Sequence, residues 1–309
     1  MLIFAEINLL KVNKKENIPV IIEIPKKELE KFDILIKQYR TKYIRTSQEI
    51  VELVLTDNKI YLQQIKSKKV SKCIADLREI VWQEYLIDEV NFNAILMRDL
   101  HKILETPKEI LEVLLNQNIT NKKGSELIES IKEICGEYAG RVFPYIYRLS
   151  LSNTQSRRSR AGKSFEAIIY KIYESLGYEY DSQSKVGRKT FDSLGLGKKV
   201  DSILPNIKCY AERRNKTIIG TMKTSLRERW QEVAEEIERT KIPEIHLLTA
   251  DESIPKSKAQ EMANHNIIVV TYEWVANSET LKSMKNIISF EEYLFEEIPN
   301  ILKFWNENK

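Results

Sequence analysis

The feature that most constrains the fold is a series of short apolar runs in the last third of the chain, separated by longer amphipathic stretches. The runs are VDSIL (200–204), IIGTMK (218–223), IHLLT (245–249) and NIIVVTY (266–272). Short runs rich in β-branched residues are typical of buried strands, and alternation with helices is typical of sheets covered by helices. The pattern predicts an α/β fold with a mixed β-sheet flanked by helices, in which residues 208–223 form strand, turn and strand.

The N-terminal part of the chain has a different pattern. VIIEI (20–24), EIVELVL (49–55) and KIYLQQI (59–65) lie between lysine-rich turns and are interpreted as a small α/β region. From about Lys72 the apolar residues follow helical spacing, so this region is predicted to be mainly helical. The polar segment near residue 120 is the predicted boundary between an N-terminal region, 1–120, and a C-terminal domain, 121–309.

Cysteine and histidine content excludes several classes of site. The three cysteines are widely spaced, which favours a reducing cytosol and argues against a disulfide framework or a zinc cluster. The three histidines are scattered, which disfavours histidine metal sites and histidine-centred triads. No apolar run is long enough to span a membrane, and the opening MLIFAEINLLK lacks a basic leader, so a cytoplasmic protein without a signal peptide is expected.

Arginine is concentrated in one part of the chain. Eleven of the 15 arginines lie between Arg141 and Arg239, whereas lysine is spread throughout. Arginine binds phosphates and guanine edges in a bidentate manner, so this segment is a candidate nucleic-acid-binding face. Chance clustering of surface arginines is the alternative. Within the segment, the polar stretch 150–162 cannot bury itself and is expected to be a loop or the start of a helix.

Asp201 and Lys223 are the first candidates for a catalytic site. If the intervening chain is an antiparallel hairpin centred on the polar stretch near Glu212, the two residues face one another on neighbouring strands. A carboxylate holds a hard divalent cation through oxygen, and a nearby lysine offsets the charge that develops on a phosphate. The pair suits metal-dependent phosphodiester cleavage, although an ordinary surface ion pair has the same residues.

Further acidic candidates lie on the predicted helices. Glu236 is on the flank of an apolar stripe that includes Val233, and Glu166 follows Phe165 on an otherwise apolar helix. Each has a structural alternative as a solvated glutamate. The helix after Lys223 opens with Arg227, Glu228 and Arg229. The two arginines are also explained as routine surface charges, and Glu228 as the partner of Ser225 in a capping box.

The stretches SNTQSRRSRAGKSFE (152–166) and KTSLRERW (223–230), with Val-Asp upstream, resemble the EcoRII, SsoII and PspGI group of type II restriction endonucleases. These are PD-(D/E)xK nucleases that recognise sites beginning with CC and ending with GG. The resemblance covers residues 150–236 and implies a PD-(D/E)xK endonuclease core. Asp201, Lys223 and Glu236 have the spacing of the group, and Glu166 lies where the group has an additional acidic residue.

The resemblance implies a role for each of these residues. Asp201 and Glu236 would bind Mg²⁺, Lys223 would act beside them, and Glu166 would support the metal site. The chain departs from the general PD-(D/E)xK pattern, because Thr221 stands two residues before the lysine in place of an acid and Val200 precedes the aspartate in place of proline. In this group the missing carboxylate comes from the helix, which is the role implied for Glu236.

The resemblance also implies how DNA is read. Arg227, Glu228 and Arg229 would contact two adjacent C·G pairs, since arginine donates to guanine and a carboxylate accepts from cytosine. Gln155 would approach the minor groove, and the phosphates would be held by Arg157, Arg158 and Arg160. Relatives stack flipped bases on an aromatic side chain. Trp82 is a candidate for that role, while its apolar helical pattern favours core packing.

The function implied is a homodimeric, Mg²⁺-dependent type II restriction endonuclease that cuts double-stranded DNA at a short palindrome. A cognate DNA methyltransferase is implied by the family alone. A structure-specific or repair nuclease on the same fold is one alternative, and it would show no sequence preference through Arg227 or Glu228. A non-catalytic DNA-binding protein is the other, and it would bind DNA without Lys223 and leave it intact.

Overall fold

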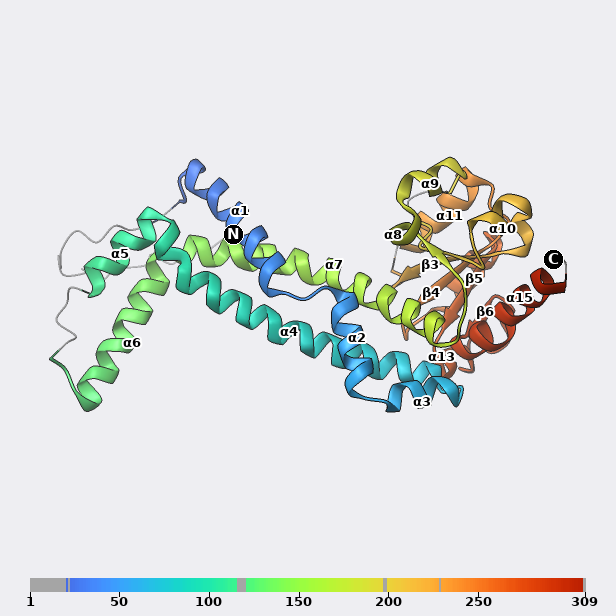
Figure 1. Ribbon diagram of the computed structural model, residues 1–309, viewed down its shortest axis with the longest axis horizontal. Coiled ribbons are helices and arrows are strands. Elements are labelled where there is room, and N and C mark those ends of the chain that lie inside the picture. The colour runs from blue at the N-terminus through green and yellow to red at the C-terminus, as the bar shows by residue number, and fades with distance from the viewer. Residues whose placement is uncertain (1–20, 22, 116–120, 197–198, 228, 308–309) are drawn as a thin grey trace, which may run out of the picture. The chain divides into compact units, whose positions relative to one another are not determined.

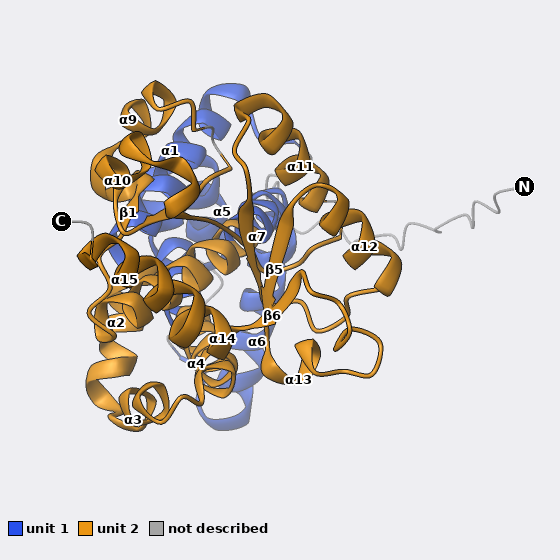
Figure 2. Cartoon of the chain, turned by 90° about the vertical axis from the view of Figure 1, so that its right-hand side faces the viewer, with its two compact units in different colours: residues 1–44, 87–156 blue, residues 45–86, 157–309 orange. Residues whose placement is uncertain are grey.

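The structure is a computed structural model, and it describes residue 21 together with residues 23–115, 121–196, 199–227 and 229–307. The chain divides into two compact units (Figure 2). Unit 1 comprises residues 1–44 and 87–156, and unit 2 comprises residues 45–86 and 157–309. The predicted division into residues 1–120 and 121–309 concerns functional regions and stays a prediction. Within the described ranges, no helix is both long enough and apolar enough to cross a membrane.

Unit 1 is built from helices (Figure 1). They are α1 (Lys26–Tyr43), the last part of α4 (Val70–Ile103), α5 (Glu105–Leu115), α6 (Gly124–Arg141) and the first part of α7 (Phe143–Ser175). In its core the rings of Phe32 and Tyr145 meet edge to face, with 5.1 Å between centroids. Arg40 connects α1 to α7, since its Nη2 donates to Asn153 Oδ1 at 2.8 Å. The N-terminal region is thus mainly helical, as predicted.

Unit 2 begins with α2 (Ser47–Asp57) and α3 (Ile60–Lys66). A capping box starts α2, in which the Thr46 hydroxyl accepts from Glu49 N at 3.2 Å and the Glu49 carboxylate accepts from Thr46 N at 2.6 Å. The α/β interpretation is therefore wrong for EIVELVL and KIYLQQI, which are helices. In the first, the buried residues recur at helical spacing, as Ile50, Val51, Val54 and Leu55. The third run, 20–24, includes residues 20 and 22, which lie outside the described residues.

A mixed six-stranded sheet forms the centre of unit 2, as predicted. Its strands lie in chain order, with β1, β2 and β3 antiparallel and β3 to β6 parallel. They are β1 (Asp181–Ser182), β2 (Ser202–Leu204), β3 (Ile218–Lys223), β4 (Ile245–Thr249), β5 (Ile267–Thr271) and β6 (Ile287–Ser289). All of β4 is buried, which is typical of a strand covered on both faces. The two edge strands, β1 and β6, were not predicted because each is only two or three residues long.

Helices cover both faces of this sheet. Figure 2 shows α11 (Arg229–Thr240) and α12 (Lys256–Asn264) on one side and α14 (Phe290–Glu292) and α15 (Ile298–Glu307) on the other. A π-helical turn, η2 (Tyr293–Glu297), joins α14 to α15. The shorter helical elements are α8 (Gln183–Val186), α9 (Arg188–Ser193), α10 (Ile207–Glu212), η1 (Arg214–Lys216) and α13 (Glu273–Ala276).

The connection from β2 to β3 differs from the predicted strand and turn. Its first part is the helix α10, which the Asn206 side chain caps by accepting from Cys209 N at 3.0 Å. Cap hydrogen bonds of this kind satisfy main-chain donors that a helix start leaves open, and they favour helix over strand. The prediction of a strand at residues 208–210 is therefore wrong, whereas the strand at 218–223 is confirmed.

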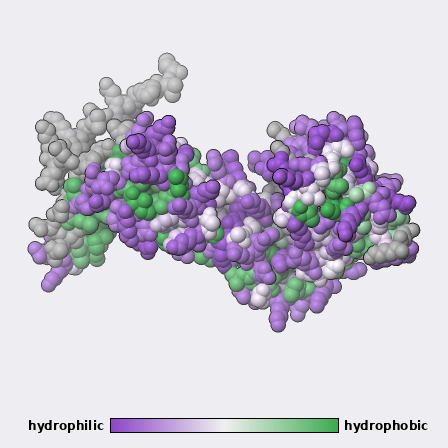
Figure 3. Space-filling view, turned by 45° about the horizontal axis from the view of Figure 1, so that its top comes forward, coloured by the Kyte–Doolittle hydropathy of each residue, from purple (hydrophilic) through white to green (hydrophobic). Residues whose placement is uncertain are grey.

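Hydrophilic side chains predominate on the visible surface, with apolar side chains gathered in smaller patches (Figure 3). In unit 1, Ile128 and Ile131 on α6 are 55% and 48% exposed. The same helix buries Ser130 and no large apolar residue. Two exposed isoleucines three residues apart lie on the same face of α6 and make that face a candidate interaction surface.

Candidate active site

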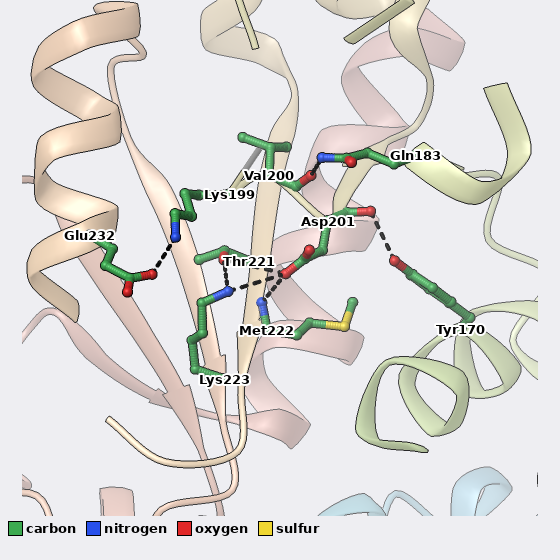
Figure 4. Close-up of polar contacts among 9 residues, drawn as sticks. All are labelled: Tyr170, Gln183, Lys199, Val200, Asp201, Thr221, Met222, Lys223 and Glu232. Carbon is green, nitrogen blue, oxygen red and sulfur yellow. Dashed lines mark hydrogen bonds and ion pairs between the residues drawn. The ribbon is translucent and has the colours of Figure 1, made fainter. Parts of the chain in front are cut away.

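The structure brings Asp201 and Lys223 together where β2 and β3 meet. Asp201 immediately precedes β2, and Lys223 is the last residue of β3. The Lys223 Nζ lies 3.7 Å from Asp201 Oδ2, and both side chains are largely buried, with exposed fractions of 14% and 18% (Figure 4). The predicted antiparallel hairpin therefore places the two charged groups on the same side of the sheet.

The register of the hairpin differs from the one predicted. Ser202 pairs with Gly220, so that Asp201 lies opposite Thr221 and not opposite Lys223. The intervening α10 and η1 break the symmetry that a simple turn at Glu212 would have had. Because side chains alternate along a strand, a shift of two residues leaves Thr221 and Lys223 on the same face. Asp201 and Lys223 are therefore still close to one another in the observed register.

Thr221 is a site residue that the sequence argument treated only as a missing acid. Its hydroxyl donates to Asp201 Oδ2 at 3.3 Å and accepts from Lys223 Nζ at 3.2 Å. The main-chain N–H of Met222 donates to the same Asp201 oxygen at 2.6 Å (Figure 4). The alternation of residues 221 and 223 along a strand was the available signal. These contacts fix the orientation of the Asp201 carboxylate.

Glu166 belongs to the same site from the side of α7. Burial raises the pKa of Glu166 to about 7, and the charge of Asp201 acts in the same direction, while Lys223 and Lys163 oppose it. Burial likewise raises the pKa of Asp201 above its ordinary value, against the influence of Lys223 and of the Met222 N–H. Two carboxyl groups that are costly to ionise side by side favour a cation between them.

Glu236 is buried on α11, and its carboxylate accepts from Arg239 Nη2 at 2.6 Å within the same helix. A different glutamate of α11, Glu232, is hydrogen-bonded to Lys199 (Figure 4). That hydrogen bond lowers the pKa of Glu232, and the charges of Lys199 and Lys223 act in the same direction. Glu232 was one of several glutamates that the sequence offers on this helix, and neither it nor Lys199 was selected as a site residue. The metal-binding role of Glu236 stays a prediction.

The described residues contain no ready-made group of three His, Cys, Asp or Glu side chains that could hold a metal ion. A magnesium site does not need one. Mg²⁺ keeps several waters and is commonly bound by one or two carboxylates together with substrate phosphate. The oxygen donors of Asp201 and Glu166, destabilised as anions by burial, fit a hard cation of this kind.

The arginines that the sequence argument assigned to base reading lie at the start of α11. Arg227 and Arg229 are both exposed, and Glu228 lies outside the described residues. The preceding main chain is held in place, since Leu226 N donates to Asp251 Oδ2 at 2.9 Å and Arg227 O accepts from Lys258 Nζ at 2.8 Å. Ser225 lies upstream of α11. The capping-box alternative involves Glu228, outside the described residues, so it stays open beside the base-reading role.

The stretch 150–162 is neither a loop nor a helix start but the middle of the continuous helix α7. Apolar residues on either side, such as Leu149 and Phe165, are buried and anchor the polar part between them. Gln155 in unit 1 is exposed, as are Arg157 and Arg158 in unit 2. Polar residues on a solvent-facing helix surface need no burial, so composition alone did not require a loop.

Arg160 differs from the other residues assigned to DNA binding. Its Nη1 donates to Ser47 Oγ at 3.1 Å, and its guanidinium lies over the ring of Tyr85, 5.0 Å from the centroid. These contacts connect α7 to α2 and α4 inside unit 2. Arg160 thus has a structural role in this state, and its role as a phosphate contact stays a prediction.

Trp82 is only half-buried, in contrast to the core packing favoured by its sequence pattern. It lines a cavity of about 410 Å³ within unit 2, whose wall also includes Arg78, Phe165 and Tyr272. Arg78 Nη1 donates to the Tyr272 hydroxyl at 2.9 Å. The spacing of apolar residues identifies which face of the helix points inward. It does not show that a cavity lies beside Trp82. A stacking role for Trp82 stays a prediction.

The chain matches one protein family by sequence and is similar to a known enzyme and to solved structures. The sequence model of the family described as EcoRII C terminal matches residues 131–294. The type II restriction enzyme SsoII of Shigella sonnei is 36% identical over 178 residues, which cover 58% of this chain and 56% of that enzyme. The aligned region thus spans little more than half the length of this relative.

Solved structures are similar over nearly the whole chain. A structure described as metal-depleted Ecl18kI in complex with uncleaved, modified DNA has a TM-score of 0.68 and 28% identity, covering 90% of this chain and 85% of that one. A PspGI–substrate DNA complex has a TM-score of 0.54 at 20% identity, covering 92% and 99%, and supports the fold alone. Since the family match includes more than half of the residues, the protein belongs to the EcoRII C-terminal family.

Proposed function

We propose that the protein is a type II restriction endonuclease that hydrolyses double-stranded DNA with Mg²⁺ as cofactor. The observation that carries the proposal is the cluster of Asp201, Lys223 and Glu166, in which one ammonium group and two desolvated carboxyl groups act on one another. Its support comes from SsoII, a relative named as a type II restriction enzyme, and from Ecl18kI, whose structure is named as metal-depleted and bound to DNA.

In this proposal Asp201 and Glu236 are the metal ligands implied by the family resemblance, and the interaction of Glu166 with Asp201 supports a second role for Glu166, as a ligand beside Asp201. When bound, Mg²⁺ supplies Lewis-acid polarisation of the phosphate and activation of a water molecule. Asp201 is kept in one orientation by Met222 N and Thr221 Oγ1. Lys223 presents a fixed positive charge that offsets the negative charge developing on the attacked phosphate. Burial of the cluster strengthens each of these interactions.

Recognition is proposed to reside at the start of α11, where Arg227, Glu228 and Arg229 read CC and GG. Gln155, Arg157, Arg158 and Arg160 on α7 are the proposed contacts to the minor groove and the phosphates. Both sets lie near the cluster in sequence terms, because Arg227 follows Lys223 on the chain and Arg160 precedes Glu166 on the same helix. Docking on the correct bases would therefore also place a phosphate for cleavage.

A homodimer is the proposed assembly, because two-fold protein symmetry matches a palindromic site and cuts both strands. The exposed Ile128 and Ile131 on α6 suit an interface between two copies. A mass in solution equal to one chain, measured by sedimentation with and without DNA, would contradict this assembly. The cognate methyltransferase is proposed from family membership alone, and protection of DNA methylated at the cleaved site would test it.

The function is tested by incubating the protein and a Lys223→Ala variant with phage DNA of known sequence and Mg²⁺. We expect discrete fragments from the native protein only, with sequenced ends that map to sites flanked by CC and GG. A smear would instead identify a structure-specific or repair nuclease. Intact DNA that shifts on a native gel would identify a DNA-binding protein without catalysis.

Loss of the base-reading carboxylate should lower specific cleavage strongly. Glu228→Ala is expected to reduce the cleavage rate at cognate sites roughly a hundredfold, because each direct contact to a C·G pair contributes about 1–3 kcal/mol and a dimer loses two of them. Rates on a short duplex measure this. Glu235→Ala, which removes an exposed glutamate of the same helix, is the matched control. Equal rates for the two variants would remove Glu228 from recognition.

A further inference from the structure

The main chain on either side of Asp201 is held by two side chains from outside the strand. The Tyr170 hydroxyl donates to the carbonyl oxygen of Asp201 at 2.9 Å, and Gln183 Nε2 donates to that of Val200 at 2.8 Å (Figure 4). The sheet itself contributes the bond from Asp201 N to Gly220 O at 2.8 Å. Val200 and Asp201 lie just before β2, outside the residues that pair with β3. Their carbonyl groups are held by these two side chains.

Tyr170 and Glu166 are on the same face of α7, because residues four apart in a helix lie one above the other. The phenol hydroxyl is hydrogen-bonded to the Asp201 main chain and lies about one helical turn from Glu166. One hydrogen bond thus connects the helix that carries Glu166 to the segment that carries Asp201.

The ring of Tyr170 is itself fixed. It stacks on the ring of Tyr180, with 5.0 Å between centroids and 13° between planes. Tyr180 is held in turn by a hydrogen bond from its hydroxyl to Glu174 Oε1 at 3.0 Å, and the Lys185 Nζ lies 3.3 Å from the centre of its ring. Stacking on one face and the hydrogen bond at the hydroxyl together restrict where Tyr170 presents its hydroxyl.

We propose that Tyr170 is a positioning residue that sets the distance between the Asp201 and Glu166 carboxylates, with Gln183 holding the adjacent peptide. The proposal rests on the proposed nuclease function, in which these carboxylates hold the metal ion. Two like charges in a desolvated site repel one another, and the Tyr170 hydrogen bond opposes a local displacement of the Asp201 segment away from Glu166. Catalytic geometry is sensitive to such movement, since a displacement of about 1 Å can lower a rate about a hundredfold.

The test compares Tyr170→Phe with Tyr178→Phe, each of which removes one hydroxyl. Tyr178 is a matched control, because its hydroxyl also donates to a main-chain carbonyl, that of Leu294, at 2.7 Å. In single-turnover cleavage of a duplex that carries the mapped site, Tyr170→Phe is expected to be about tenfold to a hundredfold slower. It should also need several-fold more Mg²⁺ for its half-maximal rate. DNA affinity without Mg²⁺ and the melting temperature should match those of Tyr178→Phe.

Gln183→Met removes the second donor at nearly constant size and is expected to show the same rise in the required Mg²⁺ concentration. It also provides the readout if Tyr170→Phe does not fold. If the native protein cuts and both Tyr170→Phe and Gln183→Met keep its rate and Mg²⁺ dependence, the positioning role is wrong while the nuclease function stands. A rate loss shared with Tyr178→Phe, or one that follows the melting temperature, would equally overturn it. A native protein that cuts no DNA would overturn the function itself.

Discussion

Asp201→Asn is expected to lower the single-turnover rate of DNA cleavage about a thousandfold or more while the protein stays folded. A carboxylate that holds a catalytic metal ion contributes several kcal/mol, and about 4 kcal/mol corresponds to a thousandfold in rate. The asparagine oxygen can still accept from Met222 N and Thr221 Oγ1, so the local hydrogen bonds persist. Gel-based cleavage of an end-labelled duplex measures the rate, and circular dichroism confirms the fold.

The same substitution should not destabilise the protein when no metal is present. Burial raises the pKa of Asp201, which means that the folded chain holds this charge at a cost that the amide avoids. Asp181→Asn is the control, because the Asp181 carboxylate also accepts from a main-chain N–H, that of Ile207, at 2.8 Å. The control should cleave at nearly the native rate. Cleavage by Asp201→Asn at a rate close to that of the control would exclude Asp201 from the metal site.

The second large effect concerns Glu166 and pH. In the absence of metal, the free energy of unfolding of the native protein should fall as pH rises from about 5 to about 8, by up to about 3 kcal/mol from this one group. The pKa of Glu166 is about 7 in the folded chain against an ordinary value of 4.5, so the folded state binds a proton that the unfolded state has released. Stability from this proton is fully present below about pH 4.5 and is lost as pH passes 7.

Urea unfolding in EDTA at a series of pH values measures this effect, with Glu166→Gln as the variant. The variant should lose less stability over the same range, because glutamine has no proton to release. Some dependence should remain, since the pKa of Asp201 is raised in the same site. Glu235→Gln, an exposed substitution on α11, should follow the native curve. Parallel curves for the native protein and Glu166→Gln would show that Glu166 is not desolvated.

The same measurement connects stability to the proposed cofactor. A cation that binds the two carboxylates stabilises their ionised forms, so Mg²⁺ should restore stability mainly at high pH. The native protein is therefore expected to gain more from Mg²⁺ near pH 8 than near pH 5, and Glu166→Gln is expected to gain less than the native protein. A gain that is independent of pH would place the ion elsewhere.

Sequence patterns predicted the central strands well and the connections poorly. IHLLT and NIIVVTY form β4 and β5 because a strand buried on both faces must be apolar over its whole length. EIVELVL is also a short run rich in Val, Leu and Ile but forms α2, since its apolar residues also fit helical spacing and a capping box starts the helix. Short apolar runs are ambiguous between the two structures, and caps and tertiary contacts decide the outcome.

The active site was likewise predicted correctly in part and wrongly in part. The spacing of Asp201 and Lys223, together with the resemblance of the surrounding stretches to a nuclease group, was sufficient to identify a charged pair that the structure does bring together. The same reasoning placed Asp201 opposite Lys223 in the hairpin, whereas Ser202 pairs with Gly220. The error was harmless because strand periodicity keeps residues two apart on one face.

What the sequence by itself determined was the set of buried strands and the chemistry-bearing residues at their ends, because both depend on residue type and local spacing. Only the tertiary structure showed that Glu166 is desolvated beside Asp201, that Glu232 binds Lys199, and that Tyr170 and Gln183 hold the main chain at Asp201 and Val200. The physical reason is that burial and main-chain hydrogen bonds have no residue signature. Every peptide offers the same carbonyl acceptor, so the packing of distant segments decides which one a side chain reaches.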